Sequence, residues 1–219
     1  MQAIFLGNEA RLKSFRETIS EARFGRFLKE ADGDQFHAID LYYWNAQLAQ
    51  CLYFPLQTWE VAFRNRLNAF LVWKYKADWP YNEVFLRNLK GNERNRLLEA
   101  RQRQEGNRGA SRAPTDSIVA DLSAGFWVAL LKPGYDFPFS WRYNLARIYP
   151  HAQNHDRAAY YQVSDMLLDL RNRVAHHEPV LHLDLAALHR ELMAAITQLC
   201  PAAKAYSKAA CSFRDVWNL

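Results

Sequence analysis

The feature that most restricts the fold of this chain is one long segment, from Gln35 to Tyr75, whose apolar residues recur with the period of an α-helix. Pro55 lies inside this segment. A proline in a helix interior removes one backbone hydrogen bond and its ring crowds the preceding turn. We therefore predict helix on both sides of Pro55, with a kink or a split into two helices at that residue.

The rest of the chain has the same helical character and no strand-like alternation of useful length. Apolar spacing and turn residues predict helices over 9–29, 83–104, 115–131, 141–148, 156–177 and 184–199, with a restart at Pro201 that continues to about residue 210. Thr115 or Asp116 and, later, Asp184 are the expected N-caps. Segments 105–114 and 132–140 are expected to be loops. The content of only 8 Gly and 8 Pro also favours long helices. These patterns predict an all-α, single-domain helical bundle over residues 1–219, with no significant β-sheet.

Composition limits the environment and the partners of the chain. The net charge of +5 suits an anionic partner such as RNA. Most of the basic residues are arginines, which grip phosphates, but codon bias explains the excess of arginine over lysine at least equally well. Cys51, Cys200 and Cys211 are odd in number and lack C-x-x-C spacing, which indicates a reducing compartment without structural zinc. No stretch reaches the ~18 apolar residues of a membrane span. We expect a cytoplasmic protein that needs no cofactor, no metal and no membrane.

The residues best suited to chemistry are gathered near the end of the predicted helix 156–177. This end carries Arg171, Asn172, Arg173, His176 and His177 just before a proline. An apolar stripe at helical spacing anchors the helix in the core; it consists of Met166, Leu167, Leu170 and Val174. His176 lies four residues after Asn172, and His177 four after Arg173, so each pair shares a face. The bland alternative is a polar helix end with solvated histidines, since arginine and histidine at this spacing also occur by chance.

Arginine and histidine together can cleave RNA without a metal. RNA carries its own nucleophile, the 2′-hydroxyl. Imidazole titrates near neutral pH and can move the protons, while a guanidinium stabilises the charge that develops on the phosphoryl oxygens. Arg171 lies about 140° around the helix from His176, because each residue turns the helix by ~100°. Its long side chain can still converge with His176 on one phosphate.

The string at residues 170–179, LRNRVAHHEP, resembles the hallmark of the bacterial Abi-like proteins. These proteins are a branch of the HEPN superfamily, which consists of helical domains marked by Arg-x(4–6)-His, commonly with Asn directly after the Arg. Further strings in the order of that family occur at Ser20–Phe24, Leu41–Asn45, Glu60–Asn65 and Leu122–Trp127. The resemblance spans about residues 18–200 and leaves residues 201–219 as a C-terminal extension.

The resemblance implies a metal-independent endoribonuclease that acts as a homodimer, with two Arg-His helix ends facing each other across a shared cleft. By position, Arg171 and His176 are the catalytic pair, and Asn172 is the polar partner that orients or binds RNA. His177 also fits the spacing and is the rival histidine. The expected products carry a 2′,3′-cyclic phosphate and a 5′-hydroxyl. The family also implies a role in abortive phage defence or as a toxin, with an antitoxin or regulatory partner; some members are catalytically silent modules that bind RNA or a protein.

Three further groups carry open alternatives. Glu60, Arg64 and Asn65 share one helix face, where Glu60 forms either an intrahelical pair with Arg64 or a support for the Arg171 helix. A basic run between residues 94 and 112 is either a solvated face or an RNA-backbone contact. The alternating aromatic residues from Tyr135 to Tyr143 either pin a loop to the bundle or stack on bases. The residues predicted to support the site or to bind RNA are therefore Asn172, Arg173 and His177, together with Glu60, Arg64 and Asn65.

Overall fold

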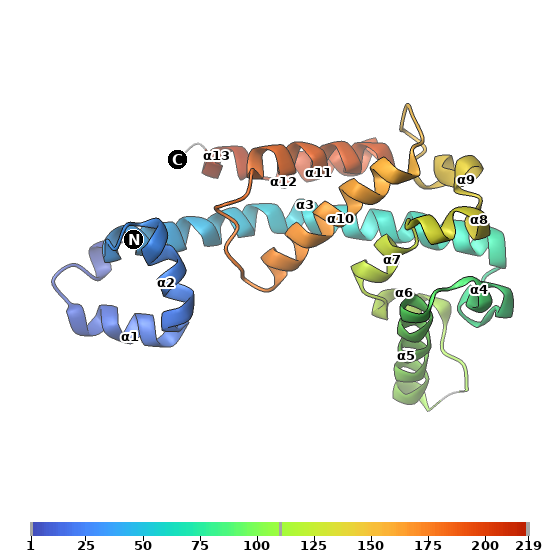
Figure 1. The fold of residues 1–219 in the computed structure, drawn as a ribbon, viewed down its shortest axis with the longest axis horizontal. Helices are drawn as coiled ribbons and strands as arrows, with labels where there is room; N and C mark the ends of the chain where they lie inside the picture. Colours follow the sequence, from blue (N-terminus) through green and yellow to red (C-terminus); the bar gives the residue numbers. More distant parts are fainter. Residues whose placement is uncertain (1, 110, 218–219) are drawn as a thin grey trace.

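The computed structural model describes residues 2–109 and 111–217 and confirms the all-α class. The chain is 79% helical, and no strand is found among the described residues. The arrangement is organised around α3 (Gln35–Tyr75), which runs the length of the molecule (Figure 1). No helix in the described part of the chain combines the length and the apolar character that a membrane span requires.

Helix α3 is one continuous helix of 41 residues, so the predicted split at Pro55 does not occur. Its first turn is capped by Asp34, whose Oδ1 accepts from the backbone N–H groups of Phe36 (2.8 Å) and His37 (3.1 Å). Pro55 is buried and leaves the carbonyl of Cys51 without its helical donor. The thiol of Cys211 donates to that oxygen (Sγ–O 3.6 Å), so tertiary contacts compensate for part of the loss.

The N-terminal end of α3 packs against η1 (Gln2–Ile4) and α2 (Glu21–Glu30), and α1 (Glu9–Ile19) packs on α2 and contacts α3 through Phe15 and Tyr42. The prediction of one helix over 9–29 is wrong, because the chain turns sharply at Ser20 (φ 76°). The Ser20 hydroxyl then caps α2 by accepting from the N–H of Arg23 (3.3 Å). The turn lets α1 and α2 close a small core with the start of α3; it contains Phe5, Leu12, Phe24, Phe27, Ala31, Ala38 and Ile39.

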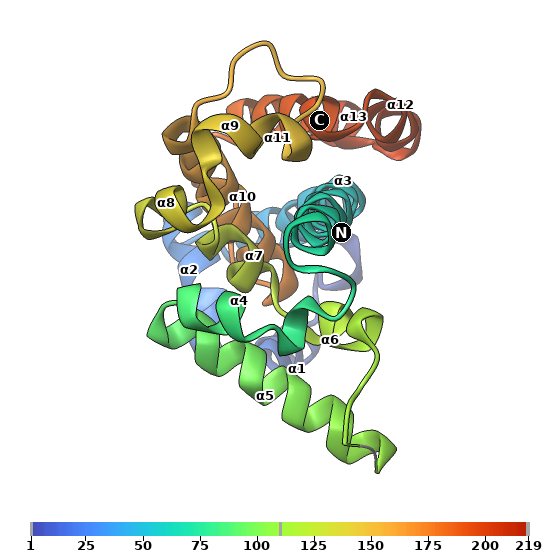
Figure 2. The same ribbon diagram turned by 90° about the vertical axis from the view of Figure 1, so that its right-hand side faces the viewer.

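One longer helix, α5, and several short helices surround the other end of α3. They are η2 (Trp79–Tyr81), α4 (Glu83–Asn88), α5 (Gly91–Arg108), α6 (Thr115–Asp121), α7 (Ala124–Ala129), η3 (Pro133–Tyr135), α8 (Asp136–Phe139) and α9 (Trp141–Ile148). Only the last of these has the predicted bounds. Figure 2 shows that α5 lies on the opposite side of α3 from α11–α13.

Several predicted boundaries in this region are wrong. The predicted helices 83–104 and 115–131 each break in two, because Leu89 and Leu122 turn into the core with extended backbone. The expected loop 105–114 starts later, since α5 continues to Arg108; Ala110 lies outside the described residues. Pro114, rather than Thr115 or Asp116, occupies the N-cap position of α6. The expected loop 132–140 contains two short helical segments, η3 and α8.

Three C-terminal helices agree with the predictions: α10 (Arg157–Ala175), α11 (Leu185–Leu199) and α12 (Pro201–Ala210). A further helix, α13 (Phe213–Trp217), is not predicted by the sequence pattern. Asp184 caps α11 as expected, with Oδ1 accepting from the N–H of Ala187 (2.9 Å). Both α10 and α11 pack directly on α3, and the described part of the predicted extension ends at residue 217. Helix α10 runs back along α3, so its C-terminal end arrives near α2 (Figure 1).

Candidate active site at the C-terminal end of α10

Helix α10 is held in the core by the predicted apolar stripe. Leu167, Leu170 and Val174 are buried, and Met166 is half-buried. This burial fixes the rotation of the helix. Arg171, Asn172 and Arg173 are therefore half-buried, whereas His176 and His177 are exposed at the helix end.

The helix ends in a Schellman motif. The N–H of Glu178 donates to the carbonyl of Arg173 (2.8 Å), and the N–H of His177 donates to that of Val174 (3.2 Å). His177 occupies the left-handed position (φ 56°), where glycine is usual. The carbonyl of His177 accepts from Nη1 of Arg23 in α2 (3.1 Å). The next residues are fixed as well, because the buried side chain of Asn45 accepts from the N–H of Val180 (2.7 Å).

The two histidines line a cavity of about 370 Å³ between α2 and the end of α10. We call it the histidine cavity; its polar lining residues are Ser20, Arg23, Arg26, His176, His177 and Glu178. Glu178 forms an ion pair with Arg173 (Nη1–Oε2 3.3 Å), which offsets its negative charge. Two arginines and two imidazoles thus share this cavity with one paired carboxylate.

Two residues with a strained backbone line the same cavity. Among the described residues, the non-glycine residues with positive φ are Ser20, Asp32, Lys76, Ser140 and His177. Two of them, Ser20 and His177, line the histidine cavity. Conformations of this kind cost about 1–3 kcal/mol each and cluster at functional sites.

Arg171 is held away from this cavity by an ion pair. Its Nε donates to Oε2 of Glu60 in α3 (2.8 Å), and its Nη1 makes a longer contact with Oδ1 of Asn172 (3.4 Å). Within the described chain Glu60 pairs with Arg171 and forms no ion pair with Arg64. The Nε of Arg64 is buried without a hydrogen-bond partner, and Asn65 is exposed.

One copy of the chain therefore does not bring all the predicted site residues together. His176 and His177 share the histidine cavity, whereas the lining of that cavity does not include Arg171 or Asn172. Arg173 contacts the same loop through Glu178. Among the described residues, the glutamate-arginine-asparagine stretch of α3 joins the site through the contact between Glu60 and Arg171.

Arg23 and Arg26 are the site residues that the sequence reasoning missed. Both lie on α2, and Arg23 reaches a carbonyl 154 residues further along the chain. In the sequence, the string Ser20–Phe24 carries only a family resemblance. The spacing of Arg23 and Arg26, three residues apart on one helix face, was the available signal.

The other predicted candidates have mostly internal partners. Arg103 forms an ion pair with Asp121 (Nη2–Oδ1 2.9 Å) that lowers the pKa of this carboxyl group, and Arg101 and Arg112 both cover the ring of Tyr81. In the aromatic segment, Tyr135, Phe139 and Trp141 are buried, whereas Phe137 and Tyr143 are exposed. These contacts favour a structural role for most residues of the basic run and for most residues of the aromatic segment.

Comparison of the chain with protein-family models, with curated proteins and with solved structures gave no match.

Proposed function

We propose that this protein is a metal-independent endoribonuclease of the Abi-like HEPN type. The observation that carries the proposal is the histidine cavity, where the exposed His176 and His177 share the lining with Arg23 and Arg26. Proton-transfer groups beside fixed positive charge are what RNA cleavage by its own 2′-hydroxyl requires. The strained backbone of Ser20 and His177 supports a functional reading of this cavity.

The reaction can be assigned to these side chains. Neutral His176 takes the proton of the 2′-hydroxyl, and the 2′-oxygen forms a bond to phosphorus. The bond from phosphorus to the 5′-oxygen breaks, and protonated His177 gives its proton to that oxygen. The products are a 2′,3′-cyclic phosphate and a 5′-hydroxyl, while the arginines stabilise the charge on the phosphoryl oxygens.

Arg171 enters this scheme from a second copy of the chain. We propose a homodimer in which Arg171 and Asn172 of one copy approach the histidine cavity of the other. The half-exposed Arg171 side chain, which is 36% accessible, permits such a contact. A shared site of this kind is tested by mixing inactive Arg171→Ala and His176→Ala proteins after dissociation. Random pairing should restore about a quarter of the wild-type activity, because half of the dimers are mixed and each holds one intact site. No restoration would refute the shared site.

The test of the reaction is an RNA cleavage assay in EDTA. We expect His176→Ala to lose at least about 100-fold in rate, as removal of a general base or acid does. His155→Ala is the matched control, because His155 is an exposed histidine just before the opposite end of α10. Equal rates for wild type, His176→Ala and His155→Ala would refute the assignment.

In the cell, we propose that cleavage of host RNA stops growth, as a toxin or in abortive phage defence, under the control of an antitoxin or regulatory partner. Wild-type protein should then be toxic when expressed, and His176→Ala should be tolerated. Equal growth with both proteins would count against this role.

A second function is favoured by one observation, the neutralisation of Arg171 by Glu60. If this pair serves only to hold α10 on α3, the protein is a catalytically silent helical module that binds RNA or a protein partner. Such a module would bind RNA in EDTA with no cleavage by any variant.

A further inference from the structure

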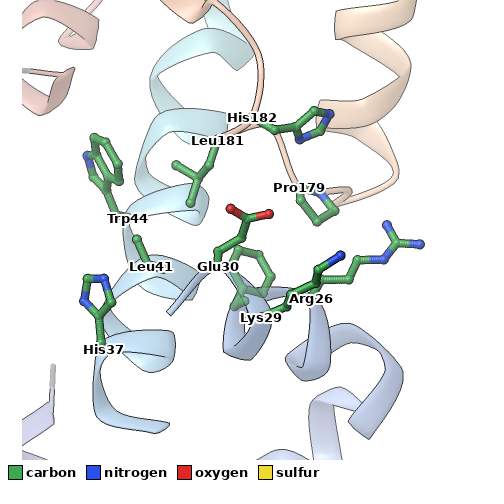
Figure 3. A pocket seen from close by; sticks show the side chains of 10 residues that line it. Arg26, Lys29, Glu30, His37, Leu41, Trp44, Pro179, Leu181 and His182 are labelled. Carbon is green, nitrogen blue, oxygen red and sulfur yellow. The ribbon is translucent and has the colours of Figure 1, made fainter. Parts of the chain in front are cut away.

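A second cavity of about 410 Å³ adjoins the histidine cavity, between α2, the first turns of α3 and the loop that follows Pro179 (Figure 3). We call it the tryptophan pocket; its lining includes Arg26, Lys29, Glu30, Leu41, Trp44 and Leu181. Its volume lies within the range of small-molecule sites, about 300–1,000 Å³. Arg26 and Pro179 line both cavities, so a chain molecule can enter the two together.

The wall of the tryptophan pocket is apolar and fixed. It contains the buried Phe27 together with Leu41 and Leu181. Trp44 is held in place, because its Nε1 donates to the carbonyl of Val216 (3.1 Å) and its ring stacks on Trp217 at 6.0 Å between centroids. A rigid aromatic and aliphatic wall of this kind suits a flat ring such as a nucleobase.

The rim of the pocket carries polar side chains that are not used inside the molecule. In the part of the chain that the structure describes, the side chains of Arg26, Lys29 and Glu30 form no hydrogen bond or ion pair, nor do the imidazoles of His37 and His182. Figure 3 shows the Glu30 carboxylate pointing toward the space between Leu181 and Pro179, with Lys29 and Arg26 beside it. The site thus presents one acceptor group and two cations to a ligand.

We infer that the tryptophan pocket binds a guanine nucleotide of the RNA substrate, next to the phosphate held in the histidine cavity. The two oxygens of Glu30 can accept from the ring N–H and the amino group on the Watson–Crick edge of guanine. Adenine places an acceptor nitrogen at the corresponding ring position, which repels a carboxylate. Lys29 and Arg26 are placed for the phosphate of the same nucleotide. This inference rests on the proposed function, because it assumes that RNA reaches the histidine cavity.

The test is calorimetric titration of the full chain with guanosine 5′-monophosphate, adenosine 5′-monophosphate and inorganic phosphate. We expect the guanine nucleotide to bind about tenfold more tightly than the adenine nucleotide, the scale of one charge-assisted hydrogen bond. Glu30→Gln should abolish this preference, and Lys29→Ala should weaken both nucleotides. Glu191→Gln and Lys132→Ala, which change exposed residues outside the pocket, should bind like wild type.

Three results would overturn the inference: no saturable binding of the guanine nucleotide, binding of phosphate as tight as that of the nucleotide, or an unchanged preference in Glu30→Gln. Binding is measured here without cleavage. A chain that prefers the guanine nucleotide through Glu30 but cuts no RNA keeps this inference and refutes the proposed function. A chain that cuts RNA but shows no preference for the guanine nucleotide refutes this inference and keeps the proposed function.

Discussion

The ion pair between Glu60 and Arg171 allows a direct test of whether Arg171 stabilises the packing of α10 on α3 or takes part in catalysis. It links α3 to α10 through a single hydrogen bond of 2.8 Å, and the two side chains are 22% and 36% exposed. A charge-assisted hydrogen bond contributes ~1.5–3 kcal/mol when buried, whereas solvent-exposed pairs contribute ~0.2–1 kcal/mol. At this intermediate exposure, we expect a coupling free energy of about 1 kcal/mol.

The assay is a double-mutant cycle of Glu60→Ala and Arg171→Ala, with the free energy of unfolding measured in urea. Each single variant should be less stable than wild type, and the double variant should lose about 1 kcal/mol less than the sum of the two. A coupling within about 0.3 kcal/mol of zero would refute the structural importance of the pair.

The same four proteins separate a catalytic Arg171 from a structural one. If Arg171 contacts the RNA phosphate, Arg171→Ala should lose about 100-fold or more in cleavage rate. Glu60→Ala should lose much less, because it leaves the guanidinium charged and frees it. If Arg171 acts only by holding the helix, both single variants should lose equal activity and the double variant should lose no more.

Three further predictions concern stability and pH. Leu170→Ala should destabilise the fold by about 2–5 kcal/mol in urea unfolding, because Leu170 is buried, whereas Leu98→Ala at an exposed position should stay within about 0.5 kcal/mol. Asp184→Ala should cost about 1 kcal/mol, the contribution of the N-cap of α11, and an unchanged midpoint would contradict the cap. Burial, with the nearby charge of Arg214, lowers the pKa of His189 below its ordinary 6.5, so the unfolded chain binds more protons and stability falls as the pH drops below that value. Unfolding at about pH 7.5 and about pH 5.5 should show a smaller difference for His189→Gln than for wild type, and an equal difference would contradict it.

The long helices could be predicted from the sequence because the apolar residues that recur with helical period are the ones that pack in the core. Helices α3, α10 and α11 bury their stripes on one another, so local pattern and tertiary packing agree. The split into two helices at Pro55 does not occur, because packing around this buried residue keeps α3 continuous. The break at Ser20 carries no proline or glycine and arises from the closure of α1 and α2 onto α3.

The candidate site also contains residues that the sequence reveals and residues that it does not. His176 and His177 were found because they are neighbours of Arg171 along one helix end. The partners that give this end its environment come from distant segments: Glu60 lies 111 residues before Arg171, and Arg23 lies 154 residues before His177. No local pattern encodes such contacts, since they depend on how α10 crosses α3 and meets α2.

The turn at His177 bears on the choice between a catalytic site and a solvated helix end. A Schellman turn needs one left-handed residue, and glycine supplies it without strain, whereas another residue costs about 1–2 kcal/mol. Here an imidazole occupies that position, and three contacts from other residues hold the loop: the Arg173–Glu178 ion pair, the hydrogen bond from Arg23 and the one from Val180 to Asn45. A solvated helix end gains nothing from a strained histidine held in this way. The cost is understandable if the imidazole of His177 must be presented, in a fixed position, to the same cavity as His176.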